Sequence, residues 1–140
     1  MGAGITAKLL YPERQVVVIT GDGSLLMAIS ELVTAVESGV NILVVVLNDS
    51  RYGIISTMQD ELYERSFGDE IGAIDFARIA EGYGAVGIRV ETPRDLPEAV
   101  DQALESSNRS AVLLDVVCDH RYCWPDRPAV LSAGLKAIGD

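Results

Sequence analysis

The amino-acid sequence predicts an α/β fold, a doubly wound parallel sheet with helices on both faces. Four short apolar runs alternate with helical segments, an order typical of right-handed crossover units that join parallel strands. These runs are rich in β-branched residues and lack polar alternation, which indicates strands covered on both faces. The expected strands are Val16–Thr20, Ile42–Leu47, Ala85–Val90 and Ala111–Val117.

The first two expected helices flank the first strand. A helix at Gly2–Leu10 is expected to stop at Tyr11, because the residue before Pro12 is kept out of the α region. A crossover helix is expected between the first two strands, since apolar residues recur there at helical spacing and form one buried face. Gly39 follows where a helix C-cap favours glycine. The apolar positions of the crossover helix are Leu25, Ile29, Leu32 and Val36.

The segment after the second strand predicts a turn at 50–53 and a helix from Ile54 to Gln59. The polar sequence YERSFGDEIG then predicts a loop, either over a site or simply in solvent, as charged loop residues usually are. Its carboxylates and the one just before it are Glu61, Glu64, Asp69 and Glu70.

Two more helices complete the expected fold. Asp75 is expected to cap a helix Phe76–Glu81. Asp95-Leu-Pro-Glu98 is typical of a capping box with proline in the first turn. The helix that it opens is expected to face the sheet with Leu96, Val100 and Leu104.

Composition sets the class of protein. The 140 residues are 49% hydrophobic and 23% charged, which predicts one globular domain over residues 1–140. The net charge of −10 disfavours nucleic acid and anionic membrane surfaces, which need basic patches. The longest strongly apolar run, Ile42–Leu47, is far shorter than the roughly 20 residues of a membrane-spanning helix. We therefore expect neither a nucleic-acid partner nor a membrane.

The C-terminal segment carries the cysteines. Cys118 and Cys123 flank His120, the only histidine, which leaves such a site one ligand short of the four that structural zinc needs. We interpret the cysteines as thiols of a cytoplasmic protein. A proline-rich extension and a short helix Leu131–Ile138 are expected beyond them. His120, Tyr122 and Trp124 could reach a neighbouring site or subunit, but packing on the domain surface is the favoured interpretation.

A candidate phosphate site lies where the first strand passes into the crossover helix. Gly21 allows a sharp turn, and Gly23 has no Cβ to keep an anion from the backbone. Ser24 can donate a hydrogen bond, and the first helical turn offers free N–H groups to phosphate. Asp22 would repel the phosphate unless a divalent cation lay between them. Magnesium is typically held by one or two carboxylates and phosphate oxygens.

The second expected strand is followed by another polar pair, Asn48-Asp49. Neighbouring parallel strands lie about 4.8 Å apart. Asp22 and Asp49, each just beyond the carboxyl end of its strand, can therefore converge on one ion.

This pattern resembles a known family. The chain carries Gly-Asp-Gly, then some two dozen residues, and then Asn-Asp followed by SRYG. This order is similar to the signature of thiamine diphosphate enzymes, such as acetolactate synthases and benzoylformate decarboxylases. The resemblance covers most of the chain and weakens after about Tyr63. It implies the thiamine diphosphate-binding fold, thiamine diphosphate and Mg²⁺ as cofactors, and metal binding by Asp22, Asp49 and the backbone carbonyl of Arg51. The implied cofactor contacts are Gly21, Asp22, Gly23, Ser24, Asp49, Tyr52, Gly53 and Ile54.

The resemblance also implies a substrate pocket at Ile54, Ile55 and Met58. Packing of the two isoleucines in the core remains the alternative. Met58 stands where biosynthetic acetolactate synthases carry a tryptophan that shapes the choice of acceptor. Asp49 stands where asparagine is commoner, and its charge makes the site more negative before the cofactor binds.

The implied function is decarboxylation of a 2-oxo acid, followed in acetolactate synthases by ligation to a second carbonyl. The glutamate that activates the cofactor is implied to come from a partner domain or subunit, so we expect a homo-oligomer. The chain is expected to be a fragment of a larger multidomain enzyme and to have no turnover alone.

Three other functions stay open at this point. The first is a benzoylformate-type simple decarboxylase. The second is a non-catalytic nucleotide-binding α/β module, although the first βα turn lacks GxGxxG. The third is a regulatory or scaffolding subunit, which would predict damage to the motif.

Overall fold

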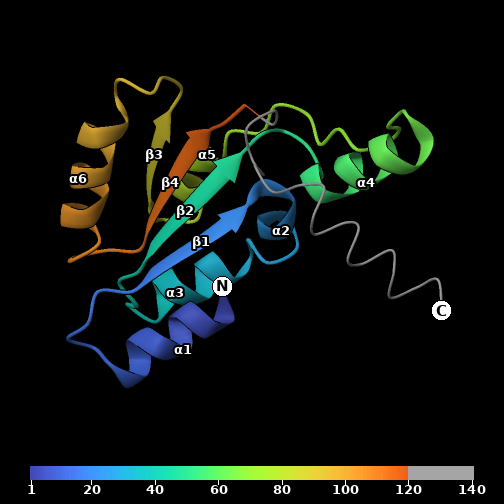
Figure 1. Cartoon of the computed structure of the whole chain (residues 1–140). Helices are drawn as coiled ribbons and strands as arrows, with labels where there is room; N and C mark the ends of the chain where they lie inside the picture. The colour runs from blue at the N-terminus through green and yellow to red at the C-terminus, as the bar shows by residue number, and fades with distance from the viewer. Residues whose placement is uncertain (120–140) are drawn as a thin grey trace.

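The structure is a computed structural model that describes residues 1–119. Its sheet has four parallel strands in the order β1-β2-β4-β3 (Figure 1). All four expected strands are confirmed, each displaced by one residue at one or both ends. Their bounds are β1 Val17–Gly21, β2 Leu43–Asn48, β3 Val86–Val90 and β4 Val112–Val117.

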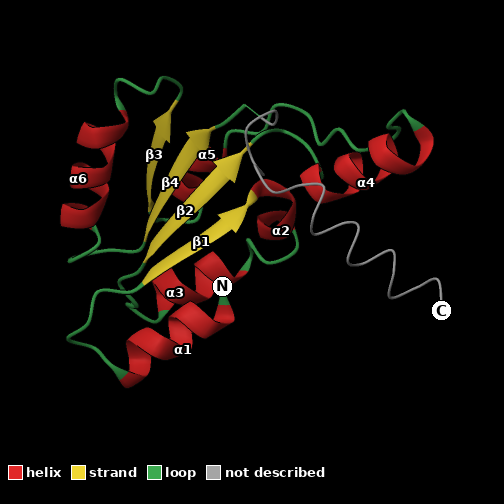
Figure 2. Cartoon of the chain, viewed as in Figure 1, coloured by secondary structure: helices red, strands yellow, loops and turns green. Residues whose placement is uncertain are grey.

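Helices cover both faces of the sheet (Figure 2). The helices that pack against one face include α1 Gly2–Leu10, α3 Glu31–Glu37 and α5 Phe76–Gly82. The steps from β1 to β2 and on to β3 run in one direction, so right-handed connections put their helices on this same side. The step from β3 to β4 runs back, so α6, Leu96–Ser106, covers the other face. The predicted doubly wound α/β fold is confirmed.

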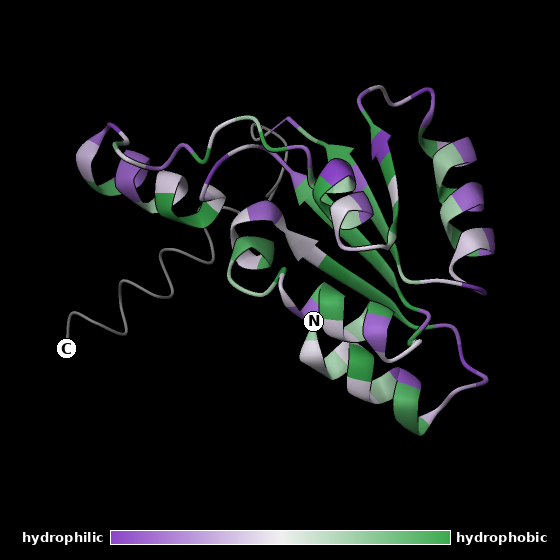
Figure 3. Ribbon diagram, turned by 180° about the vertical axis from the view of Figure 1, so that it is seen from behind, coloured by the Kyte–Doolittle hydropathy of each residue, from purple (hydrophilic) through white to green (hydrophobic). Residues whose placement is uncertain are grey.

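The sheet is the centre of two apolar layers, and its strands are mainly hydrophobic in Figure 3. Adjacent residues of a strand face opposite sides, so Val44 joins α3 and α5 in one layer while Leu43 joins α6 in the other. Leu96, Val100 and Leu104 pack on the α6 side as predicted. Polar loops begin just beyond the carboxyl ends of β1 and β2, at Asp22 and Asp49.

The expected crossover helix is split in two, which corrects the prediction of one continuous helix. The first part, α2, spans Asp22–Leu26, and α3 begins only at Glu31. Between them the backbone closes tighter turns, in which N–H groups bond to the carbonyl three residues earlier. The chain keeps turning in the same sense, and therefore Leu25 and Leu32 are both buried as predicted.

The first helix ends at Leu10 as expected, and two of the three expected helix caps are confirmed. Gly39 follows α3 with φ of +62°, and Asp75 accepts a hydrogen bond from the Arg78 N–H at the start of α5. The prediction of a capping box before α6 is wrong, because its side-chain hydrogen bond to the helix is not made. The Asp95 carboxylate accepts the Thr92 hydroxyl at 2.7 Å and caps no helical N–H.

The helix after the second strand, α4, spans Gly53–Tyr63 and extends away from the sheet (Figure 1). Within residues 1–119, no helix is both long and apolar enough to cross a lipid bilayer. The expected helix Leu131–Ile138 lies outside the described residues, as do His120, Tyr122, Cys123 and Trp124.

Candidate functional site

The glycine motif lies at the carboxyl end of the sheet. Gly21 ends β1 and Asp22 begins α2, so the motif forms the strand-to-helix junction that the sequence predicts. Gly23 faces the ring of Tyr52: a Cβ on Gly23 would lie only 2.8 Å from Cδ1 of that ring. The glycine therefore admits the tyrosine ring, a neighbour that sequence reasoning did not foresee.

Asp22 connects this junction to the loop after β2. Its side chain is buried, with Oδ1 accepting the Gly23 N–H at 2.7 Å and Oδ2 accepting the Ser50 N–H at 2.7 Å. Asp49 lies one residue before Ser50, and its Oδ1 accepts the Arg51 N–H at 3.2 Å. The two motifs, separated in the sequence, thus meet in one site.

The electrostatics of this site favour a cation. Burial raises the pKa of Asp22 above its ordinary value, and the negative charge of Asp49 raises it further. Hydrogen bonds from the N–H groups of Gly23, Ser50 and Arg51 act in the opposite direction. A divalent cation between the two carboxylates would relieve their repulsion.

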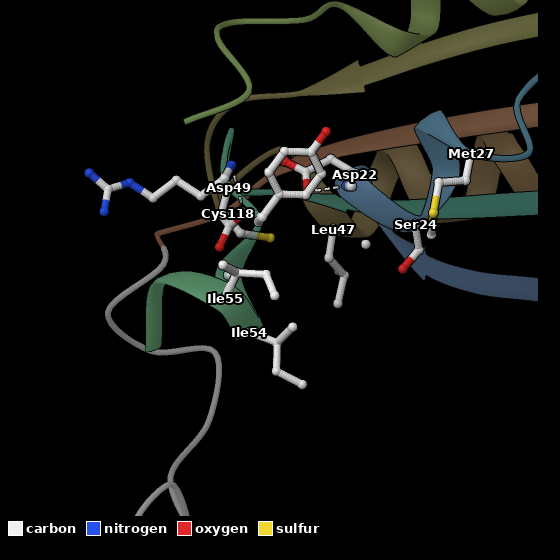
Figure 4. Close-up of a pocket in the computed structure, with 13 residues that line it drawn as sticks. Asp22, Ser24, Met27, Leu47, Asp49, Ile54, Ile55 and Cys118 are labelled. Atoms are coloured by element: carbon white, nitrogen blue, oxygen red, sulfur yellow. Dashed lines mark hydrogen bonds between the residues drawn. The ribbon is translucent and has the colours of Figure 1, made fainter. Parts of the chain in front are cut away.

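A cavity of about 590 Å³ opens between the junction of β1 with α2, the loop that follows β2, and the start of α4 (Figure 4). Every residue predicted to contact the cofactor or the metal lines it, whereas Met58 does not. Ile54 and Ile55 line it and are 57% and 46% exposed, so core packing within the described chain is not their role. The lining residues are Gly21, Asp22, Gly23, Ser24, Met27, Leu47, Asp49, Arg51, Tyr52, Gly53, Ile54, Ile55 and Cys118.

Three of these lining residues were missed from the sequence: Met27, Leu47 and Cys118. Leu47 could have been found from strand alternation, since it points away from the face that carries Val46. Met27 and Cys118 carry no local signal, because only the fold brings α2 and the end of β4 to the same opening.

The donor set fits a hard cation such as Mg²⁺. Asp22 and Asp49 offer carboxylate oxygens on one cavity, and Arg51 lines the same cavity. Among residues 1–119 no three His, Cys, Asp or Glu side chains gather into a metal-binding group. Mg²⁺ is usually held by one or two protein carboxylates, and phosphate oxygens and water supply its remaining ligands.

The loop after α4 packs against the loop that follows β2, residues 49–52. The Tyr52 N–H donates to the Asp69 carbonyl at 2.8 Å, and the Ile71 N–H donates to the Ser50 carbonyl at 2.9 Å. The Arg51 guanidinium lies 3.4 Å from the Asp69 carboxylate and 3.5 Å from that of Glu70. These contacts place the loop beside the site.

Asp69 differs from the other carboxylates of this loop. Its side chain is buried, and a hydrogen bond from the Ser56 hydroxyl lowers its pKa. Glu61, Glu64 and Glu70 are exposed, as the solvent interpretation expected. Sequence reasoning missed this distinction because the four carboxylates look alike in the sequence.

Comparison with known proteins decides the family. The family model described as "Thiamine pyrophosphate enzyme, C-terminal TPP binding domain" matches residues 1–116. The chain belongs to this family. The resemblance stated from the sequence is thereby confirmed, and so is its C-terminal binding domain.

The relatives of this thiamine pyrophosphate enzyme domain are enzymes with several different activities. It is 39% identical to acetolactate synthase isozyme 3 large subunit of Escherichia coli over 85% of this chain and 22% of that protein. It is 37% identical to pyruvate oxidase of Lactiplantibacillus plantarum over 100% of this chain and 24% of that protein. Among solved structures it matches thiamine diphosphate-dependent 4-hydroxybenzoylformate decarboxylase of Rhodococcus jostii, with a TM-score of 0.77 and 31% identity over 85% of this chain and 22% of that one.

The thiamine pyrophosphate enzyme domain therefore spans about a fifth to a quarter of the length of these relatives. The relatives themselves are larger enzymes, and the matched region is their C-terminal cofactor-binding part.

Proposed function

We propose that this chain binds thiamine diphosphate and Mg²⁺ as one domain of an acetolactate synthase-like enzyme, which decarboxylates a 2-oxo acid and ligates the product to a second carbonyl. The main support is the meeting of Asp22 and Asp49 at one cavity, joined through the Ser50 N–H. Two carboxylates on one cavity, with one of them buried, favour a cation that offsets their charge.

In this proposal the side chains of Asp22 and Asp49 and the carbonyl of Arg51 hold the Mg²⁺. Gly23 and Ser24, at the start of α2, would hold the diphosphate. Thiamine diphosphate, when bound, supplies the nucleophilic carbon and the electron sink that decarboxylation requires. The chain's own part is to anchor the cofactor.

The apolar side of the cavity has a separate role in the proposal. Leu47, Ile54 and Ile55 line the cavity and would exclude water from the reacting atoms. Met58, 37% exposed on α4 and outside the cavity lining, is proposed to meet the substrate only when a partner domain closes the site.

A partner domain or subunit is part of the proposal. α6 covers β3 and β4, whereas Val17 and Ile19 of β1 are 45% and 69% exposed on the same face of the sheet. Exposed apolar patches of this kind mark interaction surfaces. The partner would carry the activating glutamate, and the whole enzyme would be a homo-oligomer in the cytoplasm. The isolated chain is then expected to decarboxylate no pyruvate.

Ligand-dependent stabilisation tests the cofactor assignment. Thiamine diphosphate with Mg²⁺ should raise the melting temperature of the chain, because a ligand at 100 times its Kd adds about 2.7 kcal/mol to the free energy of unfolding. The increase should disappear with EDTA. Stabilisation by NAD without metal, and none by thiamine diphosphate with Mg²⁺, would favour the nucleotide-binding module instead.

Asp49 offers a test of the metal assignment. The Asp49→Asn substitution should weaken Mg²⁺ binding about tenfold, since fewer ligand charges lower the affinity for a divalent cation. Calorimetric titration of Mg²⁺ at saturating thiamine diphosphate measures this change. Asp101→Asn, on the exposed side of α6, is the matched control and should leave the affinity unchanged. Equal Mg²⁺ and cofactor affinities for Asp49→Asn and the unmodified chain would refute the assigned charge effect.

A further inference from the structure

A buried charge lies in the middle of the apolar strand β4. The Asp115 side chain is fully buried at 0% exposure and lies on the sheet face that α5 covers. Its carboxylate accepts three donors: Asn48 Nδ2 at 2.9 Å, the Phe76 N–H at 3.0 Å and the Arg89 guanidinium at 2.5 Å. A buried carboxylate is tolerated only when it is paired in this way. An apolar residue would fill the same space at lower cost, so the charge calls for a role beyond packing.

The carboxylate fixes the orientation of the Asn48 amide. Asn48 Nδ2 donates to Asp115 and also to the Ile74 carbonyl at 3.0 Å. Both partners only accept hydrogen bonds, so a reversed amide would oppose oxygen to oxygen at both positions. The amide oxygen must therefore point the other way, toward the loop that follows β2, where it accepts the Ser50 N–H at 3.3 Å.

Ser50 is the residue at which the loop turns. Its φ of +60° is uncommon for a residue with a side chain and persists only when neighbouring contacts hold it. Its N–H is shared by the Asn48 amide oxygen and by Asp22 Oδ2. The turn carries Asp49 on one side and Arg51 on the other, and these are two of the proposed metal ligands.

We propose that Asp115 and Arg89 are positioning residues for the loop that follows β2, residues 49–52, and act through the amide of Asn48. Arg89 holds Asp115, and Asp115 holds the amide that fixes the turn at Ser50. The loop is then preorganised before any ion arrives. The link to Mg²⁺ rests on the proposed function, whereas the link to the loop conformation does not.

The first experiment measures the loop without metal or cofactor. In Asp115→Asn, amide hydrogen exchange of Ser50 and Arg51 should be at least tenfold faster than in the unmodified chain, relative to core amides such as that of Val44. Leu114→Ala is the matched control, because Leu114 is the preceding residue of β4 and packs on the opposite face with α6. It loses core packing but should not accelerate the loop amides selectively. Unchanged loop exchange in Asp115→Asn would overturn the proposal.

The second experiment measures the metal by calorimetry at saturating thiamine diphosphate. Substitutions in the shell around metal ligands typically lower affinity about 10- to 100-fold. Asp115→Asn should fall in this range and Leu114→Ala should not, although both variants are less stable. Equal Mg²⁺ affinities for these two variants would refute the positioning role.

If Asp115→Asn folds poorly, Arg89→Lys and Arg89→Met replace it in the test. Arg89 is partly exposed, so its substitution should disturb folding less. Lysine keeps the charge beside Asp115 and should retain most of the Mg²⁺ affinity, whereas methionine should lose it. Equal affinities for the two variants would contradict the role of Arg89. Failure of the unmodified chain to bind thiamine diphosphate and Mg²⁺ would reject the proposed function, and hydrogen exchange would still decide the claim about the loop.

Discussion

Asp22→Asn is expected to weaken Mg²⁺-dependent binding of thiamine diphosphate by more than 100-fold, or about 2.7 kcal/mol. Asp22 is 3% exposed and contacts both loops of the site. Its carboxylate is already removed from water in the ligand-free chain, so the metal would gain a ligand that needs no further desolvation. An amide is a weaker ligand for a hard cation than a carboxylate is. After the substitution, Asp49 would supply the only carboxylate on the ion.

The folded state should survive this change. The asparagine oxygen can still accept one of the two N–H groups, and the lost hydrogen bond costs about 1 kcal/mol. Removing the buried charge also removes the cost that raises the pKa of Asp22. Isothermal titration with circular dichroism as the folding check measures both effects, and Asp101→Asn again serves as the control. Cofactor affinity within threefold of the unmodified chain would show that Asp22 holds no metal.

Gly87→Ala is expected to give the largest loss of stability among single-methyl changes, lowering the free energy of unfolding by about 3 kcal/mol. Gly87 lies in β3 beneath α5, and a Cβ there would lie 2.1 Å from the Ala77 carbonyl oxygen and 2.7 Å from its carbon. These are backbone atoms of a helix, which no side-chain rotation can move aside. The helix must shift from the sheet and lose its contacts with β3 and β4.

The melting temperature should therefore fall by roughly 10 °C for a chain of this size. Gly82→Ala is the matched control, since a Cβ at Gly82 meets nothing within 4 Å. It should be neutral or slightly stabilising, because alanine has the higher helix propensity. Equal melting temperatures for the two variants would show that α5 is free to move from β3.

The sequence by itself determined the local elements and the chemistry of the loops. The four strands could be predicted to within one residue, because buried parallel strands are uninterrupted apolar runs. Asp22, Gly23 and Asp49 could be identified because their types and positions at strand ends demand a particular ligand chemistry. Leu25 and Leu32 were identified as buried from their spacing, which survives the break between α2 and α3.

Only the tertiary structure decided the order of the strands and the partners of the buried polar groups. The position of β4 between β2 and β3 sets which chain segments meet, and no local pattern encodes it. Arg89, Asp115 and Asn48 are distant in the sequence and form one network only because β3, β4 and β2 are neighbours. Hydrophobic periodicity reports which side of an element is buried. It does not report what that side touches, because the apolar surfaces of different elements are chemically alike, and shape and connectivity choose among them.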